Sequence, residues 1–423
     1  MYQQLIDHLR NKRIVLLGMG REGHSTYNFI RRYLPEQKLI IADAKQVELD
    51  NDPNVEFVCG DGYLGVIDRA DIVIKTPGIP LLHFKRPQGV EITCQTDLFL
   101  RFSGFTCVGV TGTKGKTTTS TLIYSMLRAA GKEACLIGNM GYPVFDNIED
   151  CAGEIAVIEM SSHQLEFTTC SPHIAVLTNI YPEHLDHYDS FECYVGAKLN
   201  IVRNQSKGDT FIYNSDQGLD GFFDLSKYPG EAVGVSVHTP GAEKYRDING
   251  HLLGEHNIQN CMFAAEAARR LGVSDEDIMK ALKNYEGIEH RMEYFATVKG
   301  IKFVNDCIAT IPHSVMCAVE ALGDVDTLIF GGMDRGLDYS AFEKALEKSS
   351  IRNLVCLPDT GHKIGMHMAQ NGSEKKIIIS EDMEGAVRAA MSVTRPGCTC
   401  SRLPLRATTN IKISRKRDAI SRI

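Results

Sequence analysis

The pattern of apolar and polar positions between Phe105 and Ala130 predicts a buried strand, a glycine-rich turn and an amphipathic helix, in that order. The apolar run from Phe105 to Val110 is short and β-rich, which is typical of a buried strand. The helix is indicated by apolar residues at helical spacing, namely Leu122, Ile123, Met126, Leu127 and Ala130. The turn, residues 111–117, would point backbone N–H groups and the positive end of the helix at one concavity. This arrangement predicts a phosphate site.

The residue types in the turn extend this prediction to a nucleoside triphosphate site. Lys116 supplies a positive charge for the phosphates, and Thr117 supplies a hydroxyl for a magnesium ion. The other residues of the predicted ATP loop are Gly112, Thr113, Lys114, Gly115 and Thr118. The eight-residue P-loop pattern is incomplete, because Val110 stands where its first glycine is expected. The alternative is an ordinary strand–helix turn, which the combination of strand, loop and helix makes the weaker interpretation.

A second glycine-rich turn follows a strand near the N-terminus. The strand at residues 13–17 leads into Gly18, Gly20 and Gly23, and the next strand ends at Asp43, 20 residues beyond Gly23. This spacing is the dinucleotide-binding fingerprint, in which the turn approaches a pyrophosphate and the acid reaches a ribose. The pattern leaves three interpretations open: an NAD site, a site for another diphosphate nucleotide such as a UDP-sugar, or a vestigial turn.

A rigid loop lies further along the same predicted domain. The strand at residues 71–75 runs into Thr76, Pro77 and Gly78. Ligands of doubly wound sheets bind at the carboxyl ends of the strands. The loop is therefore a second candidate for contact with the same ligand.

The central part of the chain carries the densest chemistry. The strand at residues 155–158 ends in Glu159, where a carboxylate is placed to hold or orient magnesium. The strand at residues 174–177 leads to residues 183–187, which hold two histidines and two acids, His184 among them. This cluster suggests a metal or acid–base site, and a structural role for the histidines is the alternative. Lys198 lies in a predicted helix, and composition alone gives no reason to choose it.

The remaining pattern completes a three-domain prediction. Asn257 and Asn260 could bind a purine edge, although helix capping is the commoner use of such residues. Strands then alternate with helices up to about residue 397, which predicts a parallel, doubly wound sheet. The predicted class is α/β. The predicted domains are a Rossmann-like domain (1–98), a P-loop ATPase-type domain (99–292), a second Rossmann-like domain (293–397) and a basic tail (398–423).

Composition excludes several classes of partner. The formal net charge of the 423 residues is −7, so the whole surface does not attract nucleic acid. No apolar run reaches membrane-spanning length, and the N-terminal residues carry charges where a signal peptide needs an apolar core. The 13 cysteines lack paired zinc spacing, which favours reduced thiols and a cytoplasmic protein.

A set of motifs in a fixed order resembles the Mur ligases of peptidoglycan synthesis. The motifs are TGTKGKTTT, EMSSHQLE, TNIYPEHLDHY, GAKLNI, GEHNIQN, HRME, VND and GGMDRG, and the resemblance runs from about Ile14 to Gly397. Within the family, the SSHQLE motif and the first glycine-rich turn favour the members that use UDP-N-acetylmuramoyl-L-alanine and D-glutamate. The resemblance implies that ATP converts the substrate carboxylate to an acyl phosphate, which the amine of D-glutamate then attacks.

The resemblance also implies roles for individual residues. The UDP end of the substrate would be held by Gly18, Gly20, Gly23, Asp43 and the loop at Thr76, Pro77 and Gly78, with Asn139 near the sugar and pyrophosphate. Lys116 would bind the ATP phosphates, with Asn260 on adenine, Asp306 on the ribose and Arg291 on the phosphates. Thr117 and Glu159 would hold one magnesium ion, and His184 would serve a second. Lys198 matches a lysine that the family carbamylates, which would turn it into an oxygen ligand.

One position departs from the family pattern. Ile308 stands where many members carry a lysine for the glutamate carboxylate, although Thr310 is kept and Arg335 could substitute. The alternatives are a folylpolyglutamate-type ligase, an NAD-dependent oxidoreductase and an inactive homologue that only binds nucleotide.

The C-terminal tail is a second departure. From Ser401 to Ile423 it carries seven Lys or Arg residues and one acid, and it loses the preceding strand and helix periodicity. One interpretation is a disordered basic tail. The other is a reading-frame shift near Cys398, because permitted codons read in a shifted frame give a sequence that resembles the usual family ending. We then expect a fold that survives to about Gly397, with the last strand missing or replaced and D-glutamate ligation weak or absent.

Overall fold

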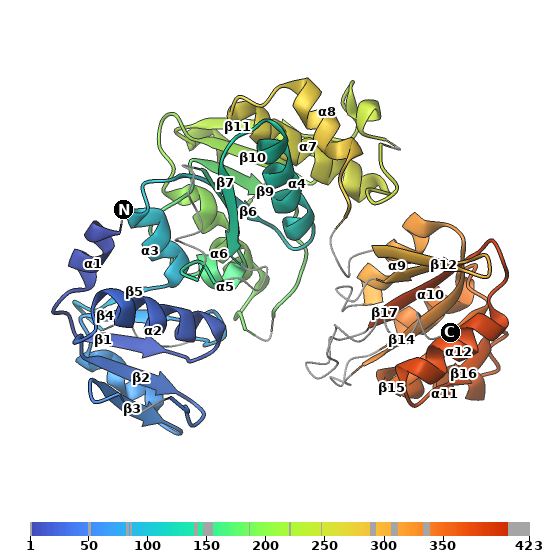
Figure 1. The fold of residues 1–423 in the computed structure, drawn as a ribbon, viewed down its shortest axis with the longest axis horizontal. Helices are drawn as coiled ribbons and strands as arrows, with labels where there is room; N and C mark the ends of the chain where they lie inside the picture. Colours follow the sequence, from blue (N-terminus) through green and yellow to red (C-terminus); the bar gives the residue numbers. More distant parts are fainter. Residues whose placement is uncertain are drawn as a thin grey trace. The chain divides into compact units, whose positions relative to one another are not determined.

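The chain forms two compact α/β units, each described here by itself. One comprises Met1–Ile248 with Glu255–Asn284, and the other comprises Asn249–Gly254 with the remaining C-terminal residues. Figure 1 traces both units of this computed structural model along the sequence. The structure describes residues 2–49, 52–81, 84, 87–138, 143–146, 155–185, 187–219, 221–246, 248–287, 293–305, 312–332 and 339–404.

The first sheet of the larger unit is parallel and has the order β3-β2-β1-β4-β5. Its strands are β1 (Ile14–Leu17), β2 (Leu39–Asp43), β3 (Val55–Cys59), β4 (Ile72–Lys75) and β5 (Glu91–Thr93). The accompanying helices are α1 (Gln3–Leu9), α2 (Arg21–Tyr33), the 3-10 helix η1 (Tyr63–Arg69) and α3 (Gln95–Phe102). All four residues of β1 are buried because they are apolar and lie at the centre of the sheet. The predicted doubly wound, Rossmann-like arrangement is confirmed.

The second sheet of this unit is also parallel, with the order β11-β10-β9-β6-β8-β7. Its strands are β6 (Thr106–Thr111), β7 (Ala134–Gly138), β8 (Ile155–Glu159), β9 (Ile174–Leu177), β10 (Thr210–Asn214) and β11 (Glu231–Val235). The helices are α4 (Lys116–Ala129), α5 (Ser162–Leu165), α6 (Phe191–Arg203), α7 (Glu255–Arg270) and α8 (Asp275–Lys283), with 3-10 turns η2 (Leu225–Lys227) and η3 (Ala242–Tyr245). The predicted strand, turn and helix around Lys116 are therefore β6, the loop and α4.

The two sheets of the larger unit share one hydrophobic core, which includes residues from both. The ring of Phe29, in α2, stacks on the ring of Phe145, which lies between β7 and β8 in the chain. The two ring centroids are 4.4 Å apart. The buried carboxylate of Asp97 accepts hydrogen bonds from the backbone N–H groups of Thr169 (2.6 Å) and Cys170 (3.2 Å). These contacts join helices α2 and α3, which accompany the first sheet, to segments that accompany the second.

The smaller unit contains a six-stranded sheet with the order β12-β13-β17-β14-β15-β16. Its strands are β12 (Glu293–Val298), β13 (Ile301–Asn305), β14 (Val325–Gly332), β15 (Asn353–Asp359), β16 (Lys376–Ile379) and β17 (Thr399–Pro404). The helices are α9 (Pro312–Leu322), α10 (Ser340–Lys348), α11 (Thr360–Gln370) and α12 (Met383–Val393). The predicted parallel sheet is confirmed for five strands, whereas the edge strand β12 is antiparallel to β13 and was not predicted.

Strand β17 is formed by the first residues of the aberrant tail. It lies between β13 and β14, pairing Val304 and Leu328 with Ser401. The last strand is thus present and carries the tail's sequence, which agrees with the expectation of a replaced strand. Ser401 is fully buried, and its hydroxyl has no hydrogen-bond partner among the described residues. An unsatisfied buried hydroxyl is unfavourable for a central strand.

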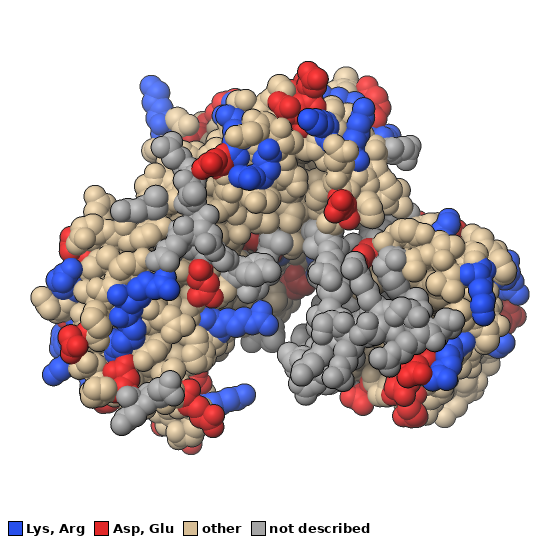
Figure 2. All heavy atoms as spheres, viewed as in Figure 1, with Lys and Arg blue, Asp and Glu red and all other residues tan. Residues whose placement is uncertain are grey.

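Two general expectations can be compared with the described residues. No helix among them is long and apolar enough to cross a membrane. Most of their cysteines are free thiols, but Cys135 is disulfide-bonded, so the expectation of uniformly reduced thiols is wrong at that position. Positive and negative side chains are interspersed on the face shown in Figure 2.

The position of β17 generates a prediction about truncation. Removing every residue after Gly397 deletes a strand that pairs with neighbours on both sides, so we expect the smaller unit not to fold. Removing only the residues after Pro404 keeps all the strands of the sheet and serves as the matched control. Amide hydrogen exchange of β13 and β14 measures the difference. Equal protection of these strands in both truncated proteins would contradict the structural role of β17.

Candidate active site

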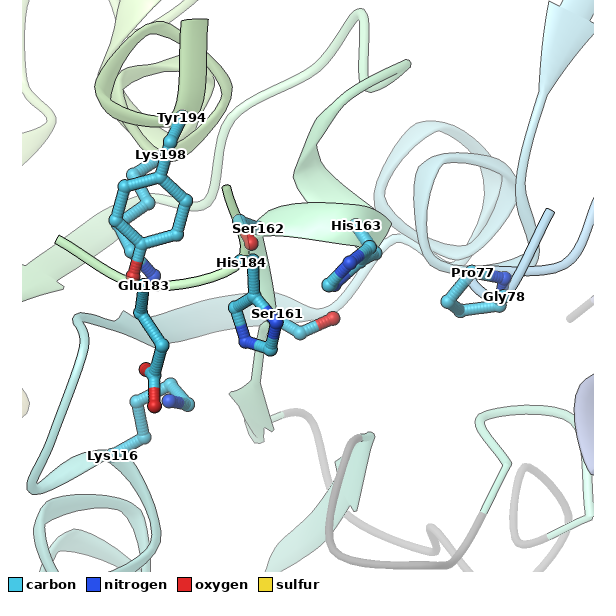
Figure 3. Close-up of a pocket in the computed structure, with 10 residues that line it drawn as sticks. All are labelled: Pro77, Gly78, Lys116, Ser161, Ser162, His163, Glu183, His184, Tyr194 and Lys198. Carbon is cyan, nitrogen blue, oxygen red and sulfur yellow. The ribbon is translucent and has the colours of Figure 1, made fainter. Parts of the chain in front are cut away.

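A pocket of about 270 Å³ lies in the larger unit, where the first sheet meets the second. Pro77 and Gly78 line it from the loop after β4, and Lys116 lines it from the start of α4. The other lining residues are Ser161, Ser162, His163, Glu183, His184, Tyr194 and Lys198, shown in Figure 3. The pocket therefore brings together five predicted site residues from both sheets: Pro77, Gly78, Lys116, His184 and Lys198.

The ATP loop between β6 and α4 adopts a conformation that needs glycine at two positions. Gly112 has φ +149°, and a Cβ atom there would lie 1.9 Å from Thr178 Oγ1. Gly115 has φ +86°, and a Cβ atom there would lie 2.4 Å from Asn260 Oδ1. The predicted adenine-binding residue, Asn260, is thus buried against the loop, where it also accepts a hydrogen bond from Thr119 Oγ1 (3.3 Å).

Side chains from the segment after β9 and from α6 hold the loop in place. The backbone N–H of Lys114 donates to Asn179 Oδ1 (2.8 Å), and the buried Thr113 hydroxyl is hydrogen-bonded to Tyr194 Oη (2.9 Å). The remaining predicted loop residues lie in the first turn of α4, with Thr118 buried and Thr117 half-buried. Backbone N–H groups at the start of a helix are available to bind phosphate oxygens.

Three lysine side chains surround the loop. Lys116 Nζ donates to the carbonyl oxygens of Gly112 (2.9 Å) and Thr113 (3.0 Å), and Lys198 Nζ donates to the same Gly112 oxygen (2.8 Å). Lys114 Nζ pairs with Glu183 Oε1 at 2.8 Å. Lys198 is almost fully buried, and burial together with the positive charge of Lys116 lowers its pKa well below the usual range. The site is therefore suited to an anion.

The residues expected to hold magnesium lie on adjacent elements. Glu159 is buried at the end of β8, paired in register with Val110 of β6, and Thr117 is the second residue of α4, directly after the loop. No group of three or more His, Cys, Asp or Glu side chains within the described ranges is arranged as a complete metal site. Magnesium usually takes only one or two carboxylates from a nucleotide-binding protein, with phosphates and water as its other ligands. A carboxylate and a hydroxyl beside a phosphate loop fit that requirement.

Another part of the pocket wall is formed by a cluster of aromatic rings. His163 packs edge-on against His184 (ring centroids 4.7 Å apart) and His187 (4.2 Å). Burial and the neighbouring positive groups, first His187 and then His184, lower the pKa of His163 to about 3. The predicted cluster at residues 183–187 is therefore divided, because Glu183 and His184 line the pocket while His187 pairs with Glu166 at 3.3 Å. Asp186 lies outside the described residues.

The first glycine-rich turn also has the geometry of a close-packed ligand loop. Gly18 has φ +92°, and a Cβ atom there would lie 2.1 Å from Thr76 Oγ1. A Cβ atom at Gly23 would lie 2.2 Å from the Gly18 carbonyl oxygen, whereas Gly20 has open space. Asp43 Oδ2 accepts a hydrogen bond from the backbone N–H of Met19 (2.8 Å). The structure thus groups the predicted turn with Asp43 and the Thr76 loop.

Several site residues were missed or cannot be placed. Ser161, Ser162, His163 and Tyr194 line the pocket without having been predicted as site residues. The sequence did contain a signal for Ser161. A serine followed three residues later by glutamine is the pattern of a capping box, which Ser161 and Gln164 form at the start of α5. Five predicted residues lie outside the described part of the chain: Asn139, Arg291, Asp306, Thr310 and Arg335.

Comparison with known proteins agrees with this architecture. Residues 110–227 match the Mur ligase middle domain, and residues 290–400 match the Mur ligase, glutamate ligase domain. The UDP-N-acetylmuramoylalanine–D-glutamate ligase of Ligilactobacillus salivarius is 31% identical, over 93% of this chain and 91% of that protein. The chain belongs to the Mur ligase family. As a Mur ligase, it is an ATP-dependent ligase of peptidoglycan synthesis.

Further relatives of this Mur ligase support the same assignment. The enzyme of the same name from Geobacillus kaustophilus is 31% identical, over 92% of this chain and 91% of that protein. Among solved structures, the fold is similar to that of a MurF ligase from Thermotoga maritima in complex with ADP (TM-score 0.61, 17% identity, 99% and 96% coverage). It is also similar to a UDP-N-acetylmuramate–alanine ligase from Thermotoga maritima (TM-score 0.59, 18% identity, 97% and 99% coverage).

The close approach at Gly115 generates a prediction about ATP binding. Gly115→Ala forces a methyl group against Asn260, so we expect ATP affinity to fall at least about tenfold, equivalent to about 1.4 kcal/mol. Gly131→Ala is the control, because Gly131 also has a positive φ (+69°) but has open space around it. Both variants should lose about 1 kcal/mol of folding stability from backbone strain. Calorimetric titration with ATP tests this, and equal affinities of the two variants would contradict the steric argument.

Proposed function

We propose that this Mur ligase joins D-glutamate to UDP-N-acetylmuramoyl-L-alanine, converting ATP to ADP and phosphate. Relatives with this printed activity are about 30% identical over more than nine-tenths of both chains. The observation that carries the proposal is the pocket itself. It has the loop at Pro77 and Gly78 on one side and Lys116 with Lys198 on the other. A long substrate bound at the first sheet would thus present its far end to the ATP loop.

The proposed reaction has two steps. The terminal carboxylate of UDP-N-acetylmuramoyl-L-alanine attacks the γ-phosphorus of ATP and gives an acyl phosphate and ADP. The amine of D-glutamate then attacks the acyl carbon, and the tetrahedral intermediate collapses to an amide and phosphate. Two anions meet in the first step, so Lys116 and the N–H groups of the loop neutralise charge and align the groups. The protein contributes position and electrostatics.

The two proposed magnesium ions neutralise phosphate charge when bound. Thr117 and Glu159 would hold one ion, and His184 with a carbamylated Lys198 would hold the other. The environment of Lys198 supports this modification, because burial and the charge of Lys116 lower its pKa and so favour the neutral amine, the form that reacts with carbon dioxide. A carbamate also replaces a buried positive charge beside Lys116 with a negative oxygen ligand.

The remaining roles are proposals carried by the family resemblance. Gly18, Gly20, Gly23, Asp43, Thr76 and Asn139 would bind the UDP-substrate. Asn260, Arg291 and Asp306 would bind ATP, and Thr310 with Arg335 would bind D-glutamate. We also propose that the enzyme is cytoplasmic, where its nucleotide substrates are.

A second candidate function is that of a nucleotide-binding homologue with weakened ligation. The observation that favours it is the sequence of β17, where the buried hydroxyl of Ser401 has no hydrogen-bond partner in the described part of the chain. A shifted reading frame near Cys398 accounts for such a residue. Under this alternative, ATP and the UDP-substrate still bind, because their proposed sites lie mainly in the larger unit. DNA sequencing across the codon of Cys398 decides whether a shifted frame exists.

The main prediction concerns phosphate release. With UDP-N-acetylmuramoyl-L-alanine, ATP and magnesium, D-glutamate should stimulate phosphate release more than other amino acids do. Lys116→Ala should abolish the signal while UDP-substrate binding survives, because loss of a phosphate-binding cation costs several kcal/mol in the transition state. A chain that binds both nucleotides and releases no phosphate would support the second candidate. Stimulation by another amino acid would overturn the choice of D-glutamate.

Carbamylation of Lys198 is tested separately. We expect Lys198→Ala to lose activity and to recover part of it when a small carboxylic acid is added, because the acid can occupy the place of the carbamate. Lys207→Ala, an exposed lysine beyond the same helix, is the control and should keep full activity. Intact-protein mass spectrometry under bicarbonate measures the modification. An unmodified Lys198 in a fully active enzyme would refute this role.

A further inference from the structure

A buried carboxyl group that was not among the predicted site residues links the two halves of the larger unit. Glu22 lies in the first turn of α2, inside the glycine-rich turn, and Gln164 lies in α5 of the second sheet. Gln164 Nε2 donates a hydrogen bond to Glu22 Oε1 at 2.7 Å. The second oxygen, Glu22 Oε2, is also buried and has no hydrogen-bond partner among the described residues. Ionising a buried carboxyl group with an oxygen that lacks a hydrogen-bond partner costs free energy. The presence of such a group in the fold therefore requires an explanation.

The amide of Gln164 transmits this contact to the pocket. Its Oε1 atom accepts hydrogen bonds from the backbone N–H (2.9 Å) and the hydroxyl (3.1 Å) of Ser161. Ser161 lines the pocket. The amide can serve both neighbours only if its N–H group faces Glu22 and its oxygen faces Ser161. Glu22 therefore fixes one wall of the pocket through a single bridging residue.

Within the described ranges, few charged groups lie around Glu22. Lys75, at the end of β4, is the positive group that faces it, and Cys94, the N-cap of α3, faces it as a neutral thiol. Lys75 Nζ is itself 3.6 Å from Glu166 Oε2, and that carboxylate also pairs with His187. Because Glu166 already neutralises Lys75, little positive charge is left to stabilise an ionised Glu22. Burial accordingly raises the pKa of Glu22 to about 7.

Resting on the function proposed above, we infer that Glu22 is a positioning residue whose neutral form is required for tight binding of the anionic UDP-substrate. The diphosphate of that substrate would bind at the glycine-rich turn that contains Glu22. An ionised carboxylate there, with little water to screen it, repels the diphosphate. The neutral carboxyl removes this repulsion and retains the link to Gln164. Binding is therefore coupled to the uptake of one proton by a residue that does not touch the reacting atoms.

The direction of the pH effect follows from this coupling. Below about pH 7 the neutral form dominates and affinity is at its maximum. Above it, affinity should fall by up to about tenfold for each pH unit, because a proton must be bound together with the substrate. The effect should appear in the KM for the UDP-substrate and leave kcat at saturation little changed.

The experiment is calorimetric titration of the intact protein with UDP-N-acetylmuramoyl-L-alanine, without ATP, between about pH 6 and 8. Repeating it in two buffers of different ionisation enthalpy counts the protons taken up. Wild-type protein should take up close to one proton at pH 8, whereas Glu22→Gln should take up none and keep its pH 6 affinity at pH 8. The exposed Glu36→Gln is the matched control and should behave as wild type.

The outcomes separate this inference from the proposed function. If the wild-type protein does not bind the substrate at any pH, the proposed function fails. If it binds and Glu22→Gln keeps the wild-type pH profile, Glu22 is only a structural link and the inference is wrong. Unfolding experiments show whether the variant folds. Since the folded-state pKa is raised, wild-type stability should fall as the pH rises from about 4.5 towards 7, and Glu22→Gln should lose this dependence.

Discussion

The carbonyl oxygen of Gly112 accepts hydrogen bonds from two lysines, and the chemistry of the larger unit depends on this arrangement. Lys116 approaches it from α4 and Lys198 from α6, so two positive groups share one acceptor in a poorly solvated site. Such a pair is stable only if an anion binds or one amine gives up its charge. A nucleotide phosphate satisfies the first condition, and a modified lysine satisfies the second. The same repulsion thus favours both substrate binding and the proposed carbamate.

The pocket also requires that the two sheets of the larger unit keep a fixed position relative to each other. At Asp97 both carboxyl oxygens are used, since Oδ1 accepts the backbone N–H groups of Thr169 and Cys170 and Oδ2 accepts the hydroxyl of Thr93. The link at Glu22 differs, because one carboxyl oxygen is left without a hydrogen bond among the described residues. A structural anchor would be expected to use both oxygens. The second oxygen of Glu22 therefore makes this contact sensitive to the protonation state of its carboxyl group.

Sequence patterns predicted those parts of the site that are local in the chain. The glycine-rich turns, the strands before them and Lys116 were readable because spacing and residue type determine them within about ten residues. Lys198 could not be chosen this way, since a lysine on a helix is ordinary until the fold brings it to the Gly112 carbonyl. The packing of His163 on His184 likewise joins two loops, which periodicity does not describe. Strand β12 was missed because its antiparallel pairing at an edge interrupts an otherwise parallel pattern.

If the reading frame is shifted near Cys398, as proposed above, the smaller unit would keep a strand and still have an altered site. Backbone hydrogen bonds form β17 without regard to side chains, so a six-residue segment of altered sequence can still pair with β13 and β14. The strand nevertheless ends at the carboxyl edge of the sheet, where the backbone of Pro404 pairs with that of Gly331. Ligands of such sheets bind at that edge. Under this proposal, folding and ligation place different demands on this segment: folding needs its backbone, and ligation would need the side chains that a shifted reading frame would replace.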